Sequence, residues 1–577
     1  MSDKSRRIIK RILLLGSVFA AIKLIFVDYT LDEEYQIVMA YRNLIGDDLF
    51  KQMWEPHQTS AFLCSGLMWL YCTVTGTTTG VLLFLRVVAL AVQVLLSLWM
   101  YRVISTVIDR EYAYILALLY FNIVPKNIQI PEFSNMQLWF LTIAVLLLMK
   151  YLGMEKQQRR KHFYLLIGVG ISLSCEILTY PTCILLFPLF LFFILRKAER
   201  DKWRGCCILT GTCAVCGGLW LTWVLSHVSV QELIRNAQSM LSFDVSHDVS
   251  GVTSAKVFNY LYNFKLWGIM LAGVALCAGF LTIMVSLWKM KRSKVRLEKR
   301  ELWLRFWMFA IAIAEGIQLY YWVIEDCGYE YLQIHLLVIW LAAAFLWKYA
   351  GKEKGFLQVG IWATLVAYAG VMYISDLAMY YTLPHGALGI VFSCVAIILA
   401  LQAVWKERAT VWIYFLIVSF CLCSMIGKGY TLRGGKALNS VFAVGGVMKD
   451  GPAAGILAEY MCAYIYNSNF EDYGEYIRPG DRVLIVANTV MSVGTTAYLF
   501  EDVDICHYSI VDPTAYDERL LAYWEQFPEK QPNVIVVDCW YGELKEDPNH
   551  WIMQYIESDF GYTSVQDGRY VRFYRRE

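Results

Sequence analysis

The apolar stretch ILLLGSVFAAIKLIFV at 12–27, which runs directly into the acidic stretch DYTLDEEY at 28–35, decides the fold class. An apolar segment that ends abruptly in charged sequence is typical of a helix leaving a lipid bilayer. It has no small-residue cleavage site, so we expect a retained helix and not a signal peptide. Of the 577 residues, 58% are hydrophobic and 17% are charged, whereas about a quarter of a soluble protein's residues are charged. The sequence predicts a polytopic α-helical membrane protein.

Hydropathy predicts thirteen transmembrane spans within residues 1–428. A span needs about 20 mostly apolar residues, and clusters of Lys and Arg mark its ends. The apolar run 163–195 is divided near Tyr180-Pro181, because proline cannot continue the first helix, and we expect a tight helical hairpin there. The predicted spans are 12–27, 80–101, 112–124, 136–149, 163–178, 181–195, 205–225, 266–288, 303–324, 332–347, 356–374, 387–404 and 410–427.

Basic residues are distributed unevenly between the two sets of connecting segments. The segments on the N-terminal side of the predicted membrane hold 30 Lys and Arg residues, and the opposite loops hold 6. Lys and Arg near span ends are retained in the cytoplasm, so we expect a plasma-membrane protein with a cytoplasmic N-terminus and an external segment after about residue 428. The formal net charge of +2 gives no reason to expect nucleic acid as a partner.

Residues 429–577 are predicted to form a separate soluble α/β domain outside the membrane. From residue 428 onward the chain has 13 basic and 22 acidic residues. Asp567-Gly568 predicts a hairpin with a two-residue turn, and the glycines at 445–455 lack the dinucleotide-binding spacing after a strand. An alternation of strands and helices, typical of a three-layer domain, is predicted from β-rich runs at 483–487, 503–510 and 534–537 and helical stretches at 453–466, 514–527 and 550–559.

Most of the 16 cysteines lie in apolar runs and are expected to be small buried hydrophobic residues. The CxxC motif at 213–216 has no second pair or histidine near it, so it does not predict a metal or redox centre. A disulfide between two of Cys462, Cys506 and Cys539 is compatible with the sequence but not required.

The first outer loop is the strongest candidate for chemistry. Between residues 28 and 60 it carries seven acidic residues against two basic ones. Asp32 and Glu33 lie within a turn or so of the predicted membrane surface. A carboxylate held near apolar surface can have its pKa raised toward neutrality and serve as a general base. The alternative is a solvated loop without chemistry, since outer loops tolerate acids.

Several short motifs occur in a recognisable order along the membrane part. They are Asp32-Glu33, Gly46-Asp-Asp-Leu-Phe50, His57-Gln-Thr59, Arg86 in its span, the run LTYPTCILLFP at 178–188, and Tyr329-Glu-Tyr-Leu332. This order resembles the GT-C superfamily of integral membrane glycosyltransferases. The likeness is greatest to the family 39 type, which includes protein O-mannosyltransferases and the aminoarabinose transferases of lipid A. The resemblance covers about residues 10–430 in organisation and does not extend to the C-terminal domain.

The resemblance implies an inverting transfer of a sugar from a polyprenyl-phosphate carrier, whose tail lies among membrane lipids, to an envelope glycan, lipid or protein on the outer face. Asp32 would be the general base, and Glu33 would orient it or bind acceptor. A structural cap on the following helix is the alternative for Glu33. Neither a metal nor another cofactor is expected. Donor or acceptor binding is implied for His57, Arg86, Lys126, Glu132, Tyr180 and Tyr331.

Two of these assignments have structural alternatives. Lys126 is a lone cation opposite acids and could hold a phosphate, or it could anchor to lipid headgroups. Arg86 lies within apolar sequence, where charges tend to mark function, but it could snorkel to the interface. Glu132 stands where relatives carry a second acidic residue. Glu176, another acid in apolar sequence, could pair across helices.

The sequence also departs from the family pattern. His57 is followed by Gln-Thr and not Pro-Pro, Tyr180 stands where a lysine is common, and Glu330 stands where a basic residue is common. These departures leave an inactive GT-C-like scaffold as one alternative, and a lipid-linked-glycan flippase or transporter as another. Few charged or Gly/Pro-broken positions occur at mid-span, which argues against transport.

A possible metal motif in the second long loop is rejected. His247 with Asp244 and Asp248 has no diagnostic ligand spacing, so we expect ordinary loop residues.

Overall fold

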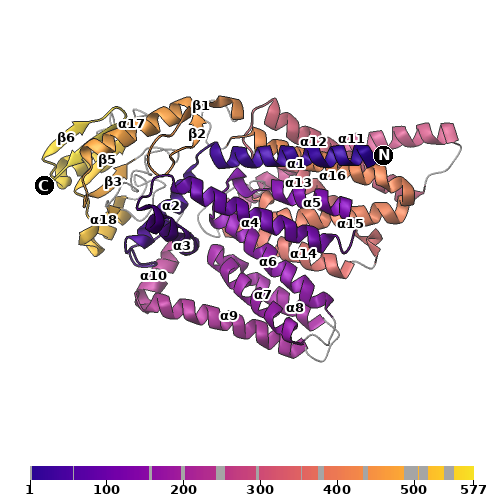
Figure 1. Cartoon of the computed structure of the whole chain (residues 1–577), viewed down its shortest axis with the longest axis horizontal. Coiled ribbons are helices and arrows are strands. Elements are labelled where there is room, and N and C mark those ends of the chain that lie inside the picture. The colour runs from indigo at the N-terminus through magenta and orange to yellow at the C-terminus, as the bar shows by residue number, and fades with distance from the viewer. Residues whose placement is uncertain are drawn as a thin grey trace.

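The computed structural model describes residues 3–55, 57–154, 159–196, 202–241, 254–293, 298–351, 354–374, 382–432, 440–486, 504–505, 517–538 and 551–577. The chain is a multi-pass helical membrane protein in which a bundle of long helices carries a small β-sheet region at one end (Figure 1). The N-terminus lies at the end of the bundle away from the sheet.

Sixteen helices, some joined by short 3₁₀ turns, precede the sheet region in the described part of the chain. They are α1 (Asp3–Phe26), α2 (Leu31–Leu44), α3 (Gln58–Thr75), α4 (Val81–Ile104), α5 (Arg110–Asn122), α6 (Phe133–Gly153), α7 (Arg159–Thr179), α8 (Leu186–Arg196), α9 (Lys202–Leu225), α10 (Val230–Leu241), α11 (Ser254–Ser293), α12 (Lys299–Val323), α13 (Ile334–Leu346), α14 (Lys354–Ile374), α15 (Ala387–Trp405) and α16 (Ala409–Tyr430).

A helix lies on each of the thirteen predicted spans. Within the described residues, eight helical segments are long and apolar enough to cross a membrane. One of these segments, Leu383–Tyr430, contains both α15 and α16, and two further apolar helical segments are shorter. The number of crossings therefore stays a prediction. The predicted break is present, because α7 ends at Thr179 and Pro181 opens a 3₁₀ turn, η2 (Pro181–Leu185).

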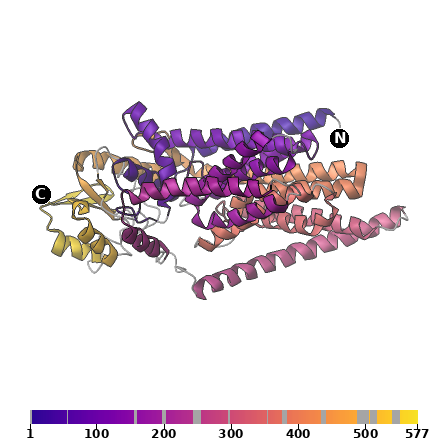
Figure 2. The same ribbon diagram turned by 90° about the horizontal axis from the view of Figure 1, so that it is seen from below.

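The helices differ in how much of their apolar surface the protein itself covers. In the most apolar window of Leu383–Tyr430, 78% of the residues are buried, against 11% in Lys202–Leu225 and 17% in Tyr260–Arg292. Most of the large side chains that α9 and α11 leave uncovered are apolar, as expected of helices that face lipid. Figure 2 shows α11 along one edge of the bundle.

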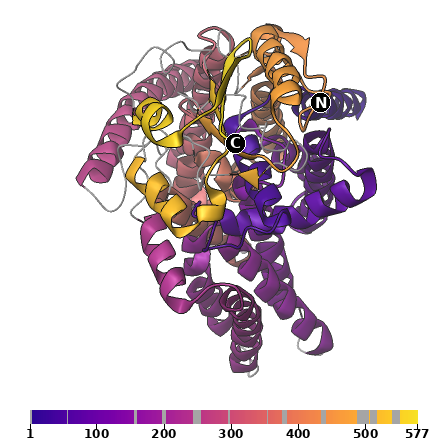
Figure 3. The ribbon, with the colours of Figure 1, turned by 90° about the vertical axis from the view of Figure 1, so that its left-hand side faces the viewer.

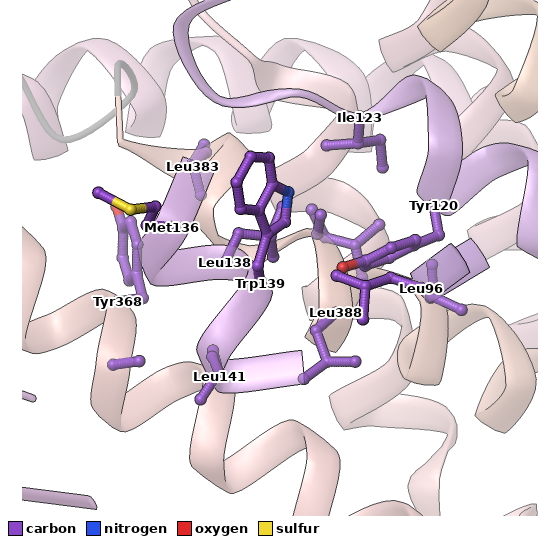
Figure 4. Close-up of a cluster of buried hydrophobic side chains, with 14 of the residues drawn as sticks. Leu96, Tyr120, Ile123, Met136, Leu138, Trp139, Leu141, Tyr368, Leu383 and Leu388 are labelled. Atoms are coloured by element: carbon purple, nitrogen blue, oxygen red, sulfur yellow. The ribbon is translucent and has the colours of Figure 1, made fainter. Parts of the chain in front are cut away.

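The interior of the bundle is largely apolar, and the polar groups around Trp139 are paired. Figure 4 shows Trp139 of α6 among side chains that include Leu96, Tyr120 and Leu388, from α4, α5 and α15. The Trp139 indole donates to Gln93 Oε1 at 3.0 Å, and the Tyr120 hydroxyl lies 2.8 Å from Thr142 Oγ1. Pairing removes the cost of burying an unsatisfied polar group.

The C-terminal region contains a five-stranded sheet of order β4-β3-β5-β7-β6. β3 is parallel to β4 and β5, and β7 is antiparallel to β5 and β6. A smaller antiparallel pair, β1 and β2, precedes it. The strands are β1 (Val444–Val447), β2 (Leu457–Glu459), β3 (Arg482–Val486), β4 (Asp504–Ile505), β5 (Val534–Asp538), β6 (Ser564–Asp567) and β7 (Val571–Arg575).

Helices pack on both faces of this sheet, because alternate strand residues point to opposite sides. Leu484 and Val486 form one apolar cluster with α18 (Asp517–Gln526) and α20 (Trp551–Tyr555). On the other face, Phe573 meets Tyr473 of α17 (Tyr460–Tyr476) with ring centroids 6.0 Å apart. The arrangement is the layered one that the alternation of strands and helices predicts.

Two local predictions in this region need correction. The helix predicted at 453–466 is wrong in its first half, because Gly455 adopts φ +85° and residues Leu457–Glu459 pair with β1 as β2; the helix begins only at Tyr460. The predicted hairpin at Asp567 is confirmed, but three residues separate β6 from β7 and the turn is not the two-residue type.

The C-terminal region faces the viewer in Figure 3. Backbone hydrogen bonds join it to the segment that follows α1 and to the start of α4. Asp28 N–H donates to Leu457 O at 2.8 Å, and Gly80 N–H donates to Gly451 O at 2.9 Å. Leu82 N–H donates to Pro452 O at 3.1 Å. The sheet region thus sits against the segment that follows the first helix.

Candidate functional site

The segment predicted as an acidic loop is largely helical. Thr30 is the N-cap of α2 and forms a capping box with Glu33, whose carboxylate accepts from the Thr30 N–H at 3.3 Å. Asp32, Glu33 and Glu34 occupy the first turn, where the positive end of the helix dipole stabilises acids. The acidic motif therefore starts a helix at the end of the bundle nearest the sheet (Figure 1).

Glu33 and Arg86 form a buried bidentate ion pair. Arg86 Nε and Nη2 donate to the two carboxylate oxygens of Glu33 at 2.9 and 2.6 Å. The same guanidinium donates to the carbonyls of Ile25 and Asp28 at 2.9 and 2.7 Å. These bonds hold the start of α2 against the end of α1, and they occupy both side chains.

Asp32 is paired with Lys126. Lys126 Nζ lies 3.2 Å from Asp32 Oδ2, and the side chains are 6% and 18% exposed. Lys126 has a left-handed backbone, with φ +53°, which costs a non-glycine residue about 1–2 kcal/mol. The surrounding structure therefore holds this amine at Asp32 against a backbone preference.

The Lys126 amine lies over one aromatic ring, and two further rings pack against that ring. Nζ lies 4.2 Å from the centroid of Phe133, a cation–π contact. Phe133 stacks on His57 with centroids 3.9 Å apart, and Tyr180 meets both rings edge-on at 5.9 and 5.5 Å. We call Asp32, His57, Lys126, Glu132, Phe133 and Tyr180 the Phe133 cluster.

Glu132 is the N-cap of α6 and is fully buried. Its two oxygens accept from Ser134 N–H and Asn135 N–H, each at 2.8 Å. Burial raises the pKa of Glu132 to about 7, although Lys126 acts in the opposite direction. Its capping bonds explain the position of Glu132 without substrate, as they do for Glu33.

Behind the cluster lies a buried polar chain of which the sequence analysis singled out only Glu176. His385, in the 3₁₀ turn η5 (Leu383–Gly386), packs edge-on against Tyr180 with centroids 5.9 Å apart. Its Nδ1 lies 3.2 Å from Gln137 Oε1, and Gln137 Nε2 donates to Glu176 Oε1 at 2.9 Å. Glu176 thus pairs across helices. The only signal for His385 was a Pro-His pair at the start of an apolar run.

Three predicted residues lie apart from the cluster in their contacts, namely Tyr331 and the paired Glu33 and Arg86. Tyr331 packs against Tyr321 at 5.1 Å, and its carbonyl accepts from Gln318 Nε2 of α12 at 2.8 Å. Arg86 is engaged by Glu33 as described. Asp32, His57, Lys126, Glu132 and Tyr180 are the predicted site residues that the structure brings together.

A second group of buried, charged side chains lies at the C-terminal end of α2. Arg42 Nε donates to Asp47 at 2.7 Å and Nη1 to Glu55, while Lys530 Nζ lies 2.6 Å from the other Asp47 oxygen. Arg42 Nη2 also donates to the Tyr523 hydroxyl at 3.2 Å. Lys530 and Tyr523 come from the C-terminal region. That region therefore holds the C-terminal end of α2, the helix whose first turn carries Asp32.

Predictions about metals and thiols have the following outcome. Among the described residues, no group of three or more His, Cys, Asp or Glu could hold a metal ion. Cys213 and Cys216 are not joined to another described cysteine, and Cys462 Sγ donates to Glu459 Oε2 at 4.0 Å. Residues 244–248, Cys506 and Cys539 lie outside the described residues.

Three solved structures resemble the chain. The Archaeoglobus fulgidus oligosaccharyltransferase in its apo form is 10% identical, with 92% of this chain and 69% of that chain covered and a TM-score of 0.42. ArnT from Cupriavidus metallidurans bound to undecaprenyl phosphate is 10% identical, with 100% and 98% covered and a TM-score of 0.41. The same ArnT in the apo state is 11% identical over 100% and 98%, with a TM-score of 0.38.

These neighbours are membrane glycosyltransferases of the GT-C class that the sequence resembles. No protein-family model matches the chain, and no curated protein sequence does. With TM-scores below 0.5, the structural matches identify neither a donor nor an acceptor for this chain.

Proposed function

We propose that this protein is an inverting glycosyltransferase that moves a sugar from a polyprenyl-phosphate carrier to a cell-envelope acceptor on the outer membrane face. The observation that carries the proposal is the Asp32–Lys126 pair. It places a carboxylate and an ammonium 3.2 Å apart beside stacked aromatic rings. A base, a cation and an apolar wall are what transfer from a lipid-linked sugar phosphate requires.

The reaction follows from these groups. The acceptor hydroxyl attacks the anomeric carbon from the face opposite the phosphate, a new carbon–oxygen bond forms, and the bond to the phosphate oxygen breaks. Asp32 receives the hydroxyl proton as general base. Lys126 neutralises the charge that develops on the departing lipid phosphate. Attack from the opposite face inverts the anomeric configuration.

The Asp32–Lys126 ion pair also links donor binding at Lys126 to the strength of Asp32 as a base. Lys126 is the counter-charge of Asp32. A donor phosphate that binds Lys126 competes for this amine. Because a nearby positive charge favours the carboxylate form and makes it a weaker base, loss of that contact strengthens Asp32 as a base. Donor binding would then prepare the base for the acceptor.

Orientation belongs to the same proposal. The basic segments are assigned to the cytoplasm, which puts the Phe133 cluster and the C-terminal region outside. Asp32 of the Phe133 cluster lies in the first turn of α2, shortly after Asp28, whose N–H donates to Leu457 O of β2. A carrier whose tail lies in the bilayer would present its phosphate there.

The test is a transfer assay with the full-length protein in proteoliposomes, undecaprenyl phosphates carrying radiolabelled sugars, and envelope extract as acceptor. Asp32→Asn should lower the rate about 100-fold or more, as removal of a general base does, and Lys126→Gln should weaken donor use. Asp48→Asn, which changes another acid of the same segment that pairs only loosely with Lys51 at 3.5 Å, is the matched control. Unchanged transfer by the Asp32 variant would remove the mechanism, and lipid-linked sugar crossing the bilayer without transfer would favour a flippase.

A further inference from the structure

The contact between His385 and Gln137 determines which ring nitrogen of His385 can accept a further hydrogen bond. Gln137 Nε2 donates to Glu176 Oε1 at 2.9 Å, and the amide oxygen of Gln137 faces His385 Nδ1. An amide oxygen cannot donate, so His385 Nδ1 must carry the hydrogen of this 3.2 Å contact. On a neutral imidazole, Nε2 then holds a lone pair and acts as an acceptor.

This acceptor has no partner in the part of the chain that the structure describes. His385 is 2% exposed, and its Nε2 makes no hydrogen bond. A buried acceptor that is left unsatisfied is costly, and in native proteins such groups usually have a functional reason. The ring lies against Tyr180 of the Phe133 cluster, and Tyr180 in turn packs against Phe133, the ring that the Lys126 amine contacts.

The chemistry of Nε2 selects its ligand. A phosphate oxygen is itself an acceptor and cannot satisfy a lone pair, whereas a hydroxyl group can donate to it. Lys126 has the opposite preference, since an ammonium only donates. Together the two side chains match a molecule that carries a phosphate and a hydroxyl a short distance apart, and the aromatic rings between them suit an apolar sugar face.

We infer that His385 is a sugar-recognition residue whose Nε2 accepts a hydrogen bond from a hydroxyl group of the lipid-linked sugar, while Lys126 binds its phosphate. The inference rests on the proposed function, and it adds the part of the donor that distinguishes one sugar from another. Gln137 and Glu176 are positioning residues, because they act only through the ring.

Binding of two kinds of lipid, one without a sugar and one with a sugar, separates the roles of His385 and Lys126. Full-length protein is titrated with undecaprenyl phosphate alone, and with undecaprenyl phosphates carrying a hexose, a pentose or an N-acetylhexosamine, by native mass spectrometry. His385→Asn keeps a donor at the position of Nδ1 and removes Nε2. This variant should weaken the affinity for the best-binding sugar-bearing lipid by about tenfold, the size of one lost hydrogen bond to a buried group. Its affinity for undecaprenyl phosphate should stay within about twofold of the wild-type value.

Three further variants complete the design. His385→Gln places an amide at the position of Nε2 and should recover part of the sugar preference. Lys126→Gln should weaken both lipids. His335→Phe changes an equally buried histidine, 2% exposed and packed against Trp322 and Phe420, and should change neither lipid.

The outcomes are distinct. If His385→Asn weakens both lipids equally, or neither, the inference is overturned while the proposed function stands. If the wild-type protein binds neither lipid, the proposed function fails and the inference fails with it.

Discussion

Lys530 Nζ lies 2.6 Å from Asp47 Oδ1, so a residue near the end of the chain neutralises an acid that follows the helix carrying Asp32. Both side chains are about 5% exposed. Lys530→Met should leave Asp47 with Arg42 alone and destabilise this junction by about 3 kcal/mol, as expected when one partner leaves a buried pair. Faster hydrogen exchange in α2 and α18 would report it.

The control for this change is Lys449→Met, which removes an exposed lysine from the same region. Equal exchange rates in the Lys530 variant and the control would show that the C-terminal region does not hold α2 through this contact.

The Glu33–Arg86 pair predicts strong coupling between two substitutions. Arg86→Met or Glu33→Gln alone should each destabilise the protein by about 3 kcal/mol, because each leaves a buried polar partner unsatisfied. The double variant should lose much less than the sum. Thermal unfolding in detergent measures this cycle. Arg300→Met, which breaks an exposed pair with Glu298, should change stability by less than about 1 kcal/mol, and additive losses at Glu33 and Arg86 would contradict the coupling.

The left-handed backbone at Lys126 predicts a difference between two variants that both lack the amine. Glycine adopts φ +53° without strain, so Lys126→Gly should be about 1 kcal/mol more stable than Lys126→Ala. Both should lose affinity for undecaprenyl phosphate. At Lys348, whose φ is not positive, alanine should be the more stable of the two replacements. An alanine variant at 126 as stable as the glycine variant would show that the strain is absent.

Asp481 predicts an acid-sensitive contribution to stability. Burial alone would raise its pKa, but hydrogen bonds from Arg575, the Arg478 N–H and Asn533 outweigh burial, and the pKa is lowered from 3.8. A carboxyl group with a lowered folded pKa stabilises the fold above its unfolded pKa, and the contribution is lost as the pH falls through the folded pKa. Asp481→Asn should therefore be less stable than wild type at pH 7.

The difference between these two proteins should shrink as the pH falls below about 4. Melting temperatures at pH 3–7 give the comparison. A difference that does not depend on pH would show that the Arg575 contact does not control ionisation at Asp481.

Hydropathy predicts most of the helices because a membrane helix satisfies its own backbone hydrogen bonds and needs only an apolar run. The helix ends at Thr179 and the strands at 483–486 and 534–537 follow from local sequence in the same way. The helix start at Tyr460 does not, because the pairing of Leu457 with β1 overrides the helical preference of the residues before it.

The candidate site, like the fold, is predicted only in part by the sequence. A carboxylate after the first span and an isolated outer lysine are visible in sequence, and the structure brings Asp32 and Lys126 together. The pairing of Arg86 with Glu33 depends on how α4 packs against α1 and α2, and the contact of His385 with Gln137 joins positions 248 residues apart. Such contacts are products of packing, which no local pattern encodes.

The hydrogen bond between Arg42 and Tyr523 joins residues 481 positions apart. During synthesis the chain elongates from the N-terminus, so α2 emerges long before the segment that supplies Tyr523 and Lys530. Arg42 and Asp47 gain these partners only after residues 523–530 have been made. The C-terminal end of α2 is thus completed late in synthesis, and truncation before Tyr523 would be felt at residues encoded near the start.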